Sequence, residues 1–413
     1  MEVSRGYMQT EVGVIPEDWE VKTLGEIGEV RMCKRVLKYQ TREHGDVPFY
    51  KIGTFGGVAD AFISRALFEE FKRKYSFPKK GDVLISAAGT IGRAVVYDGA
   101  PAYFQDSNIV WIENDESKTT NAYLWHRYQV TKWAISHGGT VARLYNDNLR
   151  TRIYVPIPPL PEQRAIASAL SDVDALLGGL DQLIAKKRDL KQAAMQQLLT
   201  GQTRLPSFSG EWEMASLDMV TSRATGVWGY NEPDERNSRR AEIIRAGDIT
   251  QDSRLTATAT RYVAPEEFEK AKCGLDDLVI TTSGNGLGKL WWCDGRSDTA
   301  ASNFVRVLHP IGAKASGRFL YYALRSGKGL RQLQEHTATT AYPNLRPTYF
   351  STKWIPLPLP TEQTAIAANL TDMDAELAAL EARRDKTRHL KQAMMQELLT
   401  GKTRLVKPEV AHA

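Results

Sequence analysis

The sequence predicts an α+β protein with a pseudo-twofold internal repeat, in which two related globular domains are separated by two long antiparallel coiled-coil helices. A 51-residue segment that begins at Val155 recurs at Ile355, 200 residues later, with 28 identical positions and no gap. Each copy carries an unbroken helical pattern, and a stretch of strand-like runs and turn residues precedes it. Because this period is too long for a solenoid unit, we infer two copies of a whole domain-plus-helix module.

Each copy of the repeat begins with prolines and continues as a helix. The proline-rich segments at 155–161 and 355–360 block both helix and central strand, so they predict extended connectors. Apolar side chains then recur at steps of four and three, as in helices that pack along one another. They are Ile166, Leu170, Val173, Leu177, Leu180 and Ile184, and then Ile366, Leu370, Met373, Leu377 and Leu380. Both patterns end at Leu-Leu-Thr-Gly, where Gly201 and Gly401 suit the left-handed position after a helix of about 38 residues, or roughly 57 Å.

Charge changes sign along both predicted helices. The first halves carry Asp172, Asp174 and Asp181, or Asp372, Asp374, Glu376 and Glu381; the second halves carry Lys186, Lys187, Arg188 and Lys191, or Arg383, Arg384, Lys386, Arg388 and Lys391. An antiparallel pair sets acid against base, whereas a parallel pair sets acid against acid. Each exposed ion pair contributes only a few tenths of a kcal/mol, so the charges select the orientation rather than supply the stability.

A glycine pair interrupts the first helical pattern. Gly178 and Gly179 stand where the second copy has Ala378 and Ala379, and each glycine costs about 1 kcal/mol relative to alanine inside a helix. A close approach of another helix and tolerated drift in a well-packed rod explain the pair equally well.

The stretches at 17–155 and 211–355 predict two globular domains with a common skeleton. Apolar runs at 82–86 and 277–281 predict strands, and each leads into a glycine loop, at 89–93 and 284–289. A Ser-Asn pair follows in each domain, at 107–108 and 302–303. Outside this skeleton the domains differ, whereas the helices are similar. We infer two domains of one design that recognise two different things.

Catalytic motifs are absent from the sequence. The loop at 284–289 is not a P-loop, because that motif needs a glycine at Ser283 and a hydroxyl residue at Leu290. The seven histidines form no HExxH motif, and three widely spaced cysteines form no CxxC pair. The tetrapeptide with which amino-methyltransferases grip a base is also missing. We therefore expect a non-catalytic chain without a metal or cofactor of its own.

Composition is that of an ordinary globular protein. The 413 residues are 42% hydrophobic and 25% charged, with a net charge of +5, which permits a nucleic-acid partner without requiring one. No apolar run approaches the ~20 residues that span a bilayer. The first residues lack the apolar core of a secretory signal. We therefore expect a cytoplasmic location and no membrane partner.

The glycine loops favour contact with DNA. A loop that ends in Gly-Arg or Gly-Lys lets backbone N–H groups and a cation approach a phosphate or a base edge. Polar loops at 138–146 and 337–344 carry an aromatic and an amide just before the strand that leads to the helix. For any single residue, a purely structural role in its loop is the stronger explanation. The candidate DNA contacts are Lys51, Thr90, Arg93, Thr140, Arg143, Tyr145, Asn146, Arg245, Asn285, Lys289, Thr339, Thr340, Tyr342 and Asn344.

These motifs together resemble the specificity (S) subunits of type I restriction-modification systems. The resemblance rests on the Pro-rich segment with Glu-Gln before each helix, the Leu-Leu-Thr-Gly-x-Thr-Arg-Leu endings, the opening Ile-Pro-Glu-Asp-Trp-Glu at 15–20, and the Gly-Asp-aliphatic run at 81–85. It covers nearly the whole chain. Thr361 and Thr364 replace the proline and arginine of the first copy at 161 and 164. Leu275-Asp276-Asp277 stands where the first domain has Lys80-Gly81-Asp82.

The resemblance implies a DNA reader that works with catalytic partners. We expect a first target-recognition domain at 1–155, a spacer helix at 156–205, a second recognition domain at 206–355, a second spacer helix at 356–405 and a tail at 406–413. The implied partners are double-stranded DNA, two methyltransferase subunits and two restriction subunits, which bring S-adenosylmethionine, ATP and Mg²⁺. We assign Glu162, Gln163, Glu362 and Gln363, at the helix starts, to partner binding.

Two other classes of function remain open from the sequence. A self-contained nuclease or methyltransferase would need a catalytic constellation that the motifs do not supply. A coiled-coil adaptor that binds only protein would show no salt-sensitive DNA binding, whereas a DNA reader loses affinity steeply as salt rises.

Overall fold

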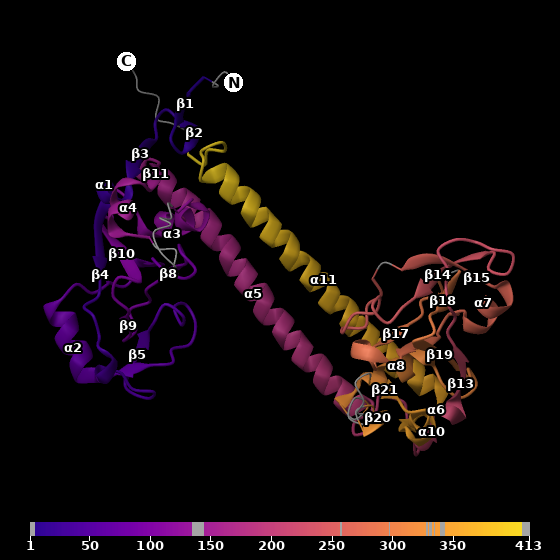
Figure 1. Ribbon diagram of the computed structural model, residues 1–413. Coiled ribbons are helices and arrows are strands. Elements are labelled where there is room, and N and C mark those ends of the chain that lie inside the picture. Colours follow the sequence, from indigo (N-terminus) through magenta and orange to yellow (C-terminus); the bar gives the residue numbers. More distant parts are fainter. Residues whose placement is uncertain are drawn as a thin grey trace. The chain divides into compact units, whose positions relative to one another are not determined.

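The computed structural model describes residues 5–133, 144–256, 258–296, 298–327, 329, 333, 335–338 and 343–406 (Figure 1). The chain divides into two compact units. Unit 1 comprises residues 1–181 and 383–413, and unit 2 comprises residues 182–382. The long helices α5 (Leu160–Leu198) and α11 (Pro360–Leu398) therefore each give one half to either unit. No helix among the described residues is both long enough and apolar enough to cross a membrane.

Both units mix strands and helices, which confirms the α+β class. Unit 1 contains β1 (Tyr7–Thr10), β2 (Gly13–Pro16), β3 (Glu20–Thr23), α1 (Leu24–Ile27), β4 (Gly28–Met32), η1 (Lys38–Gln40), β5 (Val47–Tyr50), β6 (Phe62–Ile63), α2 (Arg65–Lys74), β7 (Val83–Ser86), β8 (Ala94–Val96), β9 (Tyr103–Phe104), β10 (Ile109–Asn114), α3 (Asn121–Val130), α4 (Asn146–Thr151) and β11 (Tyr154–Ile157). Unit 2 contains β12 (Glu213–Ser216), α6 (Leu217–Val220), β13 (Thr221–Thr225), β14 (Arg239–Ile244), β15 (Ala259–Val263), α7 (Pro265–Ala271), β16 (Leu278–Thr281), η2 (Gly284–Gly286), β17 (Leu290–Trp292), β18 (Thr299–Ala301), β19 (Val305–Pro310), α8 (Gly317–Arg325), β20 (Thr337–Ala338), β21 (Asn344–Leu345), α10 (Thr348–Thr352) and β22 (Trp354–Leu357).

The internal repeat extends to the sheet topology. Unit 1 has a four-stranded antiparallel sheet of order β4-β10-β7-β8, and unit 2 has the matching order β13-β19-β16-β17. A three-stranded sheet accompanies each, β6-β5-β9 and β15-β14-β18, in which β5 pairs with β9 and β14 with β18 in parallel. The strand that leads to the long helix pairs with an early strand in both units, β11 with β3 and β22 with β12.

The central sheet of each unit is buried on both faces. In unit 1, Ile85 and its alternating neighbours pack toward the helices with Ile166 and Leu170, whereas Leu84 and Trp111 pack toward the three-stranded sheet. This explains why β7 reads as a continuous apolar run with all four residues buried. Unit 2 repeats the arrangement through separate clusters on its two faces.

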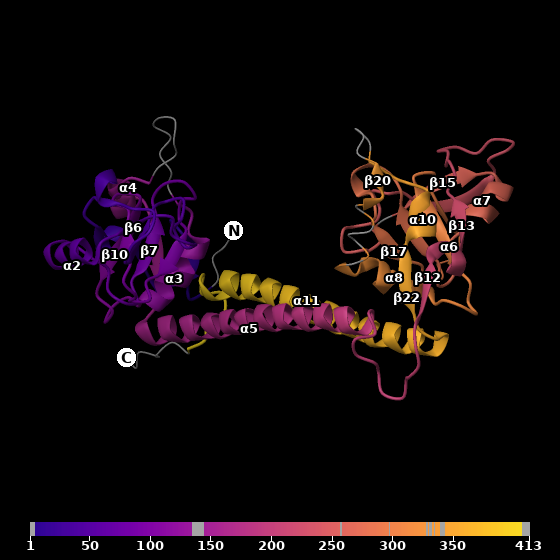
Figure 2. The same ribbon diagram turned by 90° about the horizontal axis from the view of Figure 1, so that it is seen from below.

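A short helix lies between each central sheet and the long helix, as Figure 2 shows for α3 in unit 1 and α8 in unit 2. Thr120 caps α3 by accepting a hydrogen bond from the Tyr123 N–H, and Ser316 caps α8 in the same way. These caps fix where both short helices begin.

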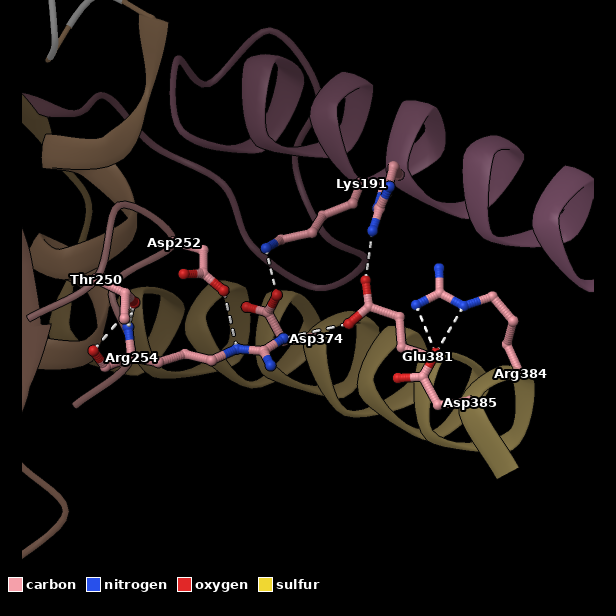
Figure 3. Close-up of polar contacts among 9 residues, drawn as sticks. Lys191, Thr250, Asp252, Arg254, Asp374, Glu381, Arg384 and Asp385 are labelled. Carbon is pink, nitrogen blue, oxygen red and sulfur yellow. Dashed lines mark hydrogen bonds and ion pairs between the residues drawn. The ribbon is translucent and has the colours of Figure 1, made fainter. Parts of the chain in front are cut away.

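Within each unit the two helix segments run antiparallel, as the charge pattern predicts. In unit 1, Lys391 pairs with Asp174 and Arg388 with Asp181. In unit 2, Lys191 pairs with Asp374, and Lys187 with Glu376 at 2.6 Å. Figure 3 shows the Lys191 pair together with Glu381 on α11.

The glycines of the repeat behave in two ways. Gly201 and Gly401 adopt φ angles of +72° and +71° just beyond α5 and α11, which confirms the predicted left-handed ends. Gly178 and Gly179 have nothing among the described residues within 4 Å of where a Cβ would lie. Close helix approach therefore does not explain this pair, and tolerated drift remains.

Candidate nucleic-acid interface

The buried carboxylate of Glu162 joins the globular part of unit 1 to its long helices. Glu162, in the first turn of α5, accepts hydrogen bonds from Arg404 at 2.6 and 2.7 Å and from Trp19 Nε1 at 3.0 Å. Arg404 also donates to Asp18 at 2.9 and 2.7 Å. These hydrogen bonds, above all those with Glu162, raise the pKa of the Arg404 guanidinium. The start of α5 and the segment after α11 are thereby held together.

Unit 2 contains the same joint. Glu362 accepts hydrogen bonds from Arg204 Nε and Nη2, both at 2.6 Å, and from Trp212 Nε1 at 3.2 Å. Arg204 donates its remaining hydrogen bonds to the carbonyls of Ser209 and Gly210 rather than to a carboxylate. The start of α11 and the segment after α5 are held together here.

The glutamine beside each glutamate connects the helix start to the short helix above it. Gln163 accepts a hydrogen bond from the Thr120 N–H at 2.8 Å and donates to the carbonyls of Lys118 and Pro158. Gln363 accepts from the Ser316 N–H, also at 2.8 Å, and donates to the carbonyls of Lys314 and Pro358. Both ends of each amide group are therefore occupied inside one unit.

The residues that we assigned to partner binding, Glu162, Gln163, Glu362 and Gln363, are buried inside their own units. These residues are at most 1% exposed, and the hydrogen bonds just described hold them within their own units. A side chain without accessible surface cannot contact another protein unless the joint opens. The motif recurs in the sequence because it makes the joint between domain and helix, which is the same in both halves.

The strands of unit 1 end together at one edge. The Gln105 N–H donates to the Tyr50 carbonyl at 2.9 Å, which joins the ends of β9 and β5. The Ala87 N–H donates to the Asn108 carbonyl at 2.7 Å, and the Leu144 N–H donates to the Ala87 carbonyl at 2.8 Å. Loops that follow β5, β7 and β9 and the segment before α4 thus meet at this edge.

The structure brings the described DNA-contact candidates of unit 1 to this edge. Lys51 follows β5 and pairs with Asp60 at 2.9 Å. Thr90 and Arg93 lie in the glycine loop and are exposed, and Arg93 donates to the Phe55 carbonyl at 2.7 Å. Tyr145, which is exposed, and Asn146 stand at the start of α4. The remaining candidates, Thr140 and Arg143, lie outside the described residues.

A cleft of about 630 Å³ opens at the same edge. Its polar and charged lining comes from Arg35, Lys38, Thr41, Lys51, Gln105, Asp106, Ser107 and Asn108. The motif analysis missed Arg35, whose guanidinium pairs with Asp106 at 2.8 Å and whose side chain is 68% exposed. The Ser-Asn pair at 107–108, present in both domains, was the available signal, because it adjoins Asp106.

The strands of unit 2 end at an equivalent edge. The Ser302 N–H donates to the Ile244 carbonyl at 2.9 Å, and the Thr282 N–H donates to the Phe304 carbonyl at 3.0 Å. The Leu345 N–H donates to the Thr282 carbonyl at 2.8 Å. Loops that follow β14, β16 and β18 therefore meet here, as their counterparts do in unit 1.

The described candidates of unit 2 also lie at its edge. Arg245 follows β14 and donates to Asp248 at 2.8 Å, which raises the pKa of the arginine. Lys289 ends the glycine loop, and Asn344 forms a β-bridge with Ser283, the residue before that loop. Asn285 belongs to η2, but its side chain is not described. The positions Thr339, Thr340 and Tyr342 lie outside the described residues.

Both glycine loops need glycine at one position. Gly92 and Gly288 have φ angles of +82° and +80°, a region that other residues seldom adopt. A Cβ on Gly92 would lie 2.0 Å from Trp133 Nε1, and one on Gly288 would lie 2.0 Å from a methyl group of Leu333. Each loop backbone therefore lies directly against a bulky side chain, that of Trp133 in unit 1 and that of Leu333 in unit 2.

Comparison with known proteins agrees with this architecture. The family described as "Type I restriction modification DNA specificity domain" matches residues 16–186 and 210–387. A Haemophilus influenzae protein, S.HindORF215P, named for a type I restriction enzyme specificity subunit, is 58% identical over 166 residues, which is 40% of this chain and 43% of that protein. The MjaVIII specificity subunit of Methanocaldococcus jannaschii is 23% identical over 415 residues, 95% of this chain and 94% of the relative.

A solved structure shows the same fold over nearly the full length. The S subunit of a type I restriction-modification system from M. genitalium superposes with a TM-score of 0.60 at 15% identity, covering 96% of this chain and 98% of that one. The family match extends over both halves of the chain, each of which carries one strand-end edge. The chain therefore belongs to the type I restriction-modification DNA specificity family, as a specificity subunit with two recognition domains.

Proposed function

We propose that the chain reads a bipartite, asymmetric DNA sequence, with one half-site for each recognition domain, and catalyses no reaction itself. One observation carries the proposal: the same strand-end edge is built twice on the same topology but with different side chains. Phosphate contacts position a protein on DNA, whereas side chains at base edges read its sequence. Two edges of one design with different side chains therefore favour two different half-sites.

The candidate residues named above form the proposed contact surface in each unit. In unit 1 the exposed Arg35 and Arg93 and the half-buried Lys51 suit phosphates and guanine edges. In unit 2, Arg245 and Lys289 occupy the ends of β14 and of the glycine loop. The long helices, each of 39 residues, would set the spacing between half-sites, since about 58 Å of helix exceeds one turn of B-DNA at about 34 Å.

Catalysis belongs to partner subunits in this proposal. A methyltransferase subunit would supply S-adenosylmethionine chemistry, and a restriction subunit would supply ATP- and Mg²⁺-dependent cleavage. Because the Glu-Gln side chains are buried, we place docking on exposed helix surface instead. Leu190 and Leu390 occupy equivalent positions on α5 and α11 and are 48% and 55% exposed. Replacing both with aspartate should weaken co-purification of the methyltransferase subunit without unfolding the chain.

Methylation mapping tests the proposal directly. The chain is co-expressed with the methyltransferase subunit encoded beside it, and methylated bases are mapped by single-molecule sequencing. We expect a split motif with a fixed gap that disappears when this chain is omitted. A soluble complex that methylates no new site would contradict the reader role and favour a protein-only adaptor.

A domain exchange tests the assignment of half-sites. Replacing residues 206–355 with the matching domain of another specificity subunit should change one half of the motif and leave the other half and the gap unchanged. A change in both halves would refute readout by separate domains.

A further inference from the structure

Two aromatic side chains of unit 2 stand exposed at the edge where its strands end. Trp228 is 61% exposed and Phe304 is 51% exposed, and their rings pack edge to face with centroids 5.9 Å apart. Trp228 is the most exposed of the nine tryptophans in the chain. Adjacent exposed aromatics of this size are costly to leave in water and mark interaction sites.

The backbone holds both residues beside the glycine loop. The Phe304 carbonyl accepts hydrogen bonds from the Thr282 N–H and hydroxyl, at 3.0 and 3.2 Å, just before that loop begins. The Val227 N–H donates to the Ala301 carbonyl at 2.8 Å, which fixes the residue before Trp228.

Gly226 permits this close approach of the two segments. A Cβ at Gly226 would lie 1.8 Å from the Ser302 carbonyl oxygen, so only glycine brings the chain so near. The backbone at the aromatic pair is thus anchored to the sheet, while the two rings project into solvent. This is a rigid presentation of exposed side chains and not a loose end of the chain.

Unit 1 has counterparts of different chemistry at both positions. Phe304 directly follows the Ser-Asn pair of unit 2, and the residue that follows the pair in unit 1 is Ile109, which is fully buried. Trp228 stands three residues after the end of β13, and Arg35 stands three residues after the end of β4. The sheet core does not require an aromatic pair here, because the same fold forms without one.

Charges at the edge favour a polyanion as the partner of this surface. Arg245 has a side chain that is 52% exposed and adjoins Ser302 through the β14–β18 pairing. Lys289 closes the glycine loop that begins beside Phe304. An aromatic pair among cations suits nucleic acid, because the cations meet phosphates while the rings meet the apolar faces and methyl groups of bases.

We propose that Trp228 and Phe304 form an aromatic contact to bases in the half-site read by the second recognition domain. This inference rests on the proposed function and names the residues of the second domain that contact bases directly. Unit 1 presents Arg35 at the corresponding place, so the two domains read DNA there by different chemistry. The aromatic pair carries no charge and neutralises no phosphate. Its contribution to DNA affinity should therefore not depend on salt, whereas that of Arg245 and Lys289 should.

Binding measurements on the complete complex test this assignment. The full chain with its methyltransferase subunit is titrated against a fluorescein-labelled duplex that carries the mapped motif, and against one with the second half-site scrambled. Trp228→Ala and Phe304→Ala should each weaken binding to the motif by about 10-fold or more, and leave binding to the scrambled duplex unchanged. The slope of log affinity against log salt should not change. Trp228→Phe should retain binding within about 3-fold of the unaltered protein, since a ring remains.

A tryptophan on another part of unit 2 provides the matched control. Trp354 is also exposed, but it pairs with Ser216 ahead of β13, whereas Trp228 follows the end of that strand. Trp354→Ala should bind both duplexes normally. Acrylamide quenching of tryptophan fluorescence gives a readout that does not depend on how the alanine variants fold. The fluorescence of Trp228 is the emission that is present in the unaltered protein and lost in Trp228→Phe. The motif duplex should protect this emission from acrylamide.

The outcomes separate this inference from the proposed function. Unchanged affinity of both alanine variants, an equal loss on the two duplexes, or a salt slope lowered by about one would overturn the base contact while the reader role stands. Absence of protection from acrylamide would overturn it as well. If the unaltered complex does not distinguish the motif from the scrambled duplex, the proposed function itself fails.

Discussion

In unit 1, Arg404 binds Glu162 beneath Trp19, and in unit 2, Arg204 binds Glu362 beneath Trp212, with nearly the same distances. The two units differ at the edges where their strands end. Unit 1 carries a cleft with several cations, whereas unit 2 carries an exposed aromatic pair beside its glycine loop.

The difference follows from burial. At the joint, each polar group is enclosed and its partners are fixed, so a change there leaves a buried donor or acceptor unsatisfied. At the strand ends, side chains project into solvent and can change without disturbing the sheet beneath them. The two modules of this chain therefore share their joints and differ at their edges, as the proposed reading of two different DNA half-sites requires.

The largest expected effect comes from removing the carboxylate of a joint. Glu362→Ala should destabilise unit 2 by about 3 kcal/mol, because Arg204 loses its only carboxylate partner among the described residues. Glu162→Ala should cost about 2 kcal/mol, because Arg404 keeps Asp18. Hydrogen exchange measured by mass spectrometry in rising urea, read separately for peptides of each unit, gives both values.

Asp18→Ala serves as the control for this comparison. Alone it should cost less than 1 kcal/mol, since its carboxylate is partly exposed. Combined with Glu162→Ala, it should destabilise unit 1 by as much as Glu362→Ala destabilises unit 2. If the single glutamate variants affect the units equally, Asp18 does not support Arg404 and the proposed asymmetry is wrong.

An intermediate effect is expected from the buried histidine of unit 1. His126 on α3 lies 4.0 Å from Asp174 through Nδ1, whereas its counterpart Tyr322 donates a hydrogen bond to Asp374 at 2.8 Å. Burial lowers the pKa of His126 from 6.5 to about 4, although the nearby Asp174 opposes the shift. Between about pH 6.5 and 4 the unfolded chain binds a proton that the native chain does not. Unit 1 should therefore lose stability as pH falls through this window, by about 2 kcal/mol once solvent screening is allowed for.

Exchanging the two side chains tests the histidine. His126→Tyr should abolish the acid-dependent loss in unit 1, because the phenol does not titrate in this window, and its hydroxyl can reach Asp174 as Tyr322 reaches Asp374. Tyr322→His should transfer the loss to unit 2. Urea unfolding at pH 7, 5.5 and 4.5 measures both. Unchanged pH dependence in His126→Tyr would assign the acid sensitivity to other groups.

The smallest effect concerns a contact between a loop of unit 2 and α11. Arg254 donates to Glu381 at 3.2 Å (Figure 3). Arg188 donates to the same carboxylate at 2.5 Å. These hydrogen bonds, that from Arg188 first, lower the pKa of Glu381. Because Arg254 is mostly exposed, Arg254→Ala should cost only about 0.5 kcal/mol, and high salt should remove the difference.

Asp181, the counterpart of Glu381 in unit 1, is the matched control. It lies 3.7 Å from Arg384 and 3.6 Å from Arg388 and is half exposed, so Asp181→Ala should have no measurable effect. Thermal unfolding in low and high salt compares the two variants. A loss above 1.5 kcal/mol in Arg254→Ala would mean that this loop is held to the helix much more firmly than an exposed pair allows.

Much of the fold could be predicted because its signals are local or repeated. The step of four and three from Ile166 to Ile184 depends only on the pitch of a helix, and all of these residues lie in α5. The helix begins at Leu160, inside the proline-rich segment that was expected to be an extended connector. The Leu-Leu-Thr-Gly endings predicted left-handed residues at Gly201 and Gly401, whose φ angles are +72° and +71°. The apolar run at 83–86 predicted β7, because a strand buried on both faces has no polar alternation.

The candidate site was harder to predict because it depends on side chains brought together from separate strands. The glycine loops and Lys51 could be proposed because glycine and lysine beside a strand are visible in one stretch of sequence. Arg35 and Trp228 were missed because each follows a strand with no motif around it. The burial of Glu162 could not be foreseen, because repetition in the sequence marks a partner contact and an internal joint equally.

By itself the sequence determined the duplication, the two long helices, their antiparallel pairing and the class of protein, because periodicity, charge order and repeated motifs are properties of the chain taken in order. The tertiary structure alone decided which of the repeated polar residues are buried and which strand ends meet. It also decided that an exposed aromatic pair stands beside the cations of the unit 2 edge, whereas unit 1 presents Arg35 at the corresponding place. Burial and proximity arise when distant segments pack against one another, and a linear pattern does not contain that information.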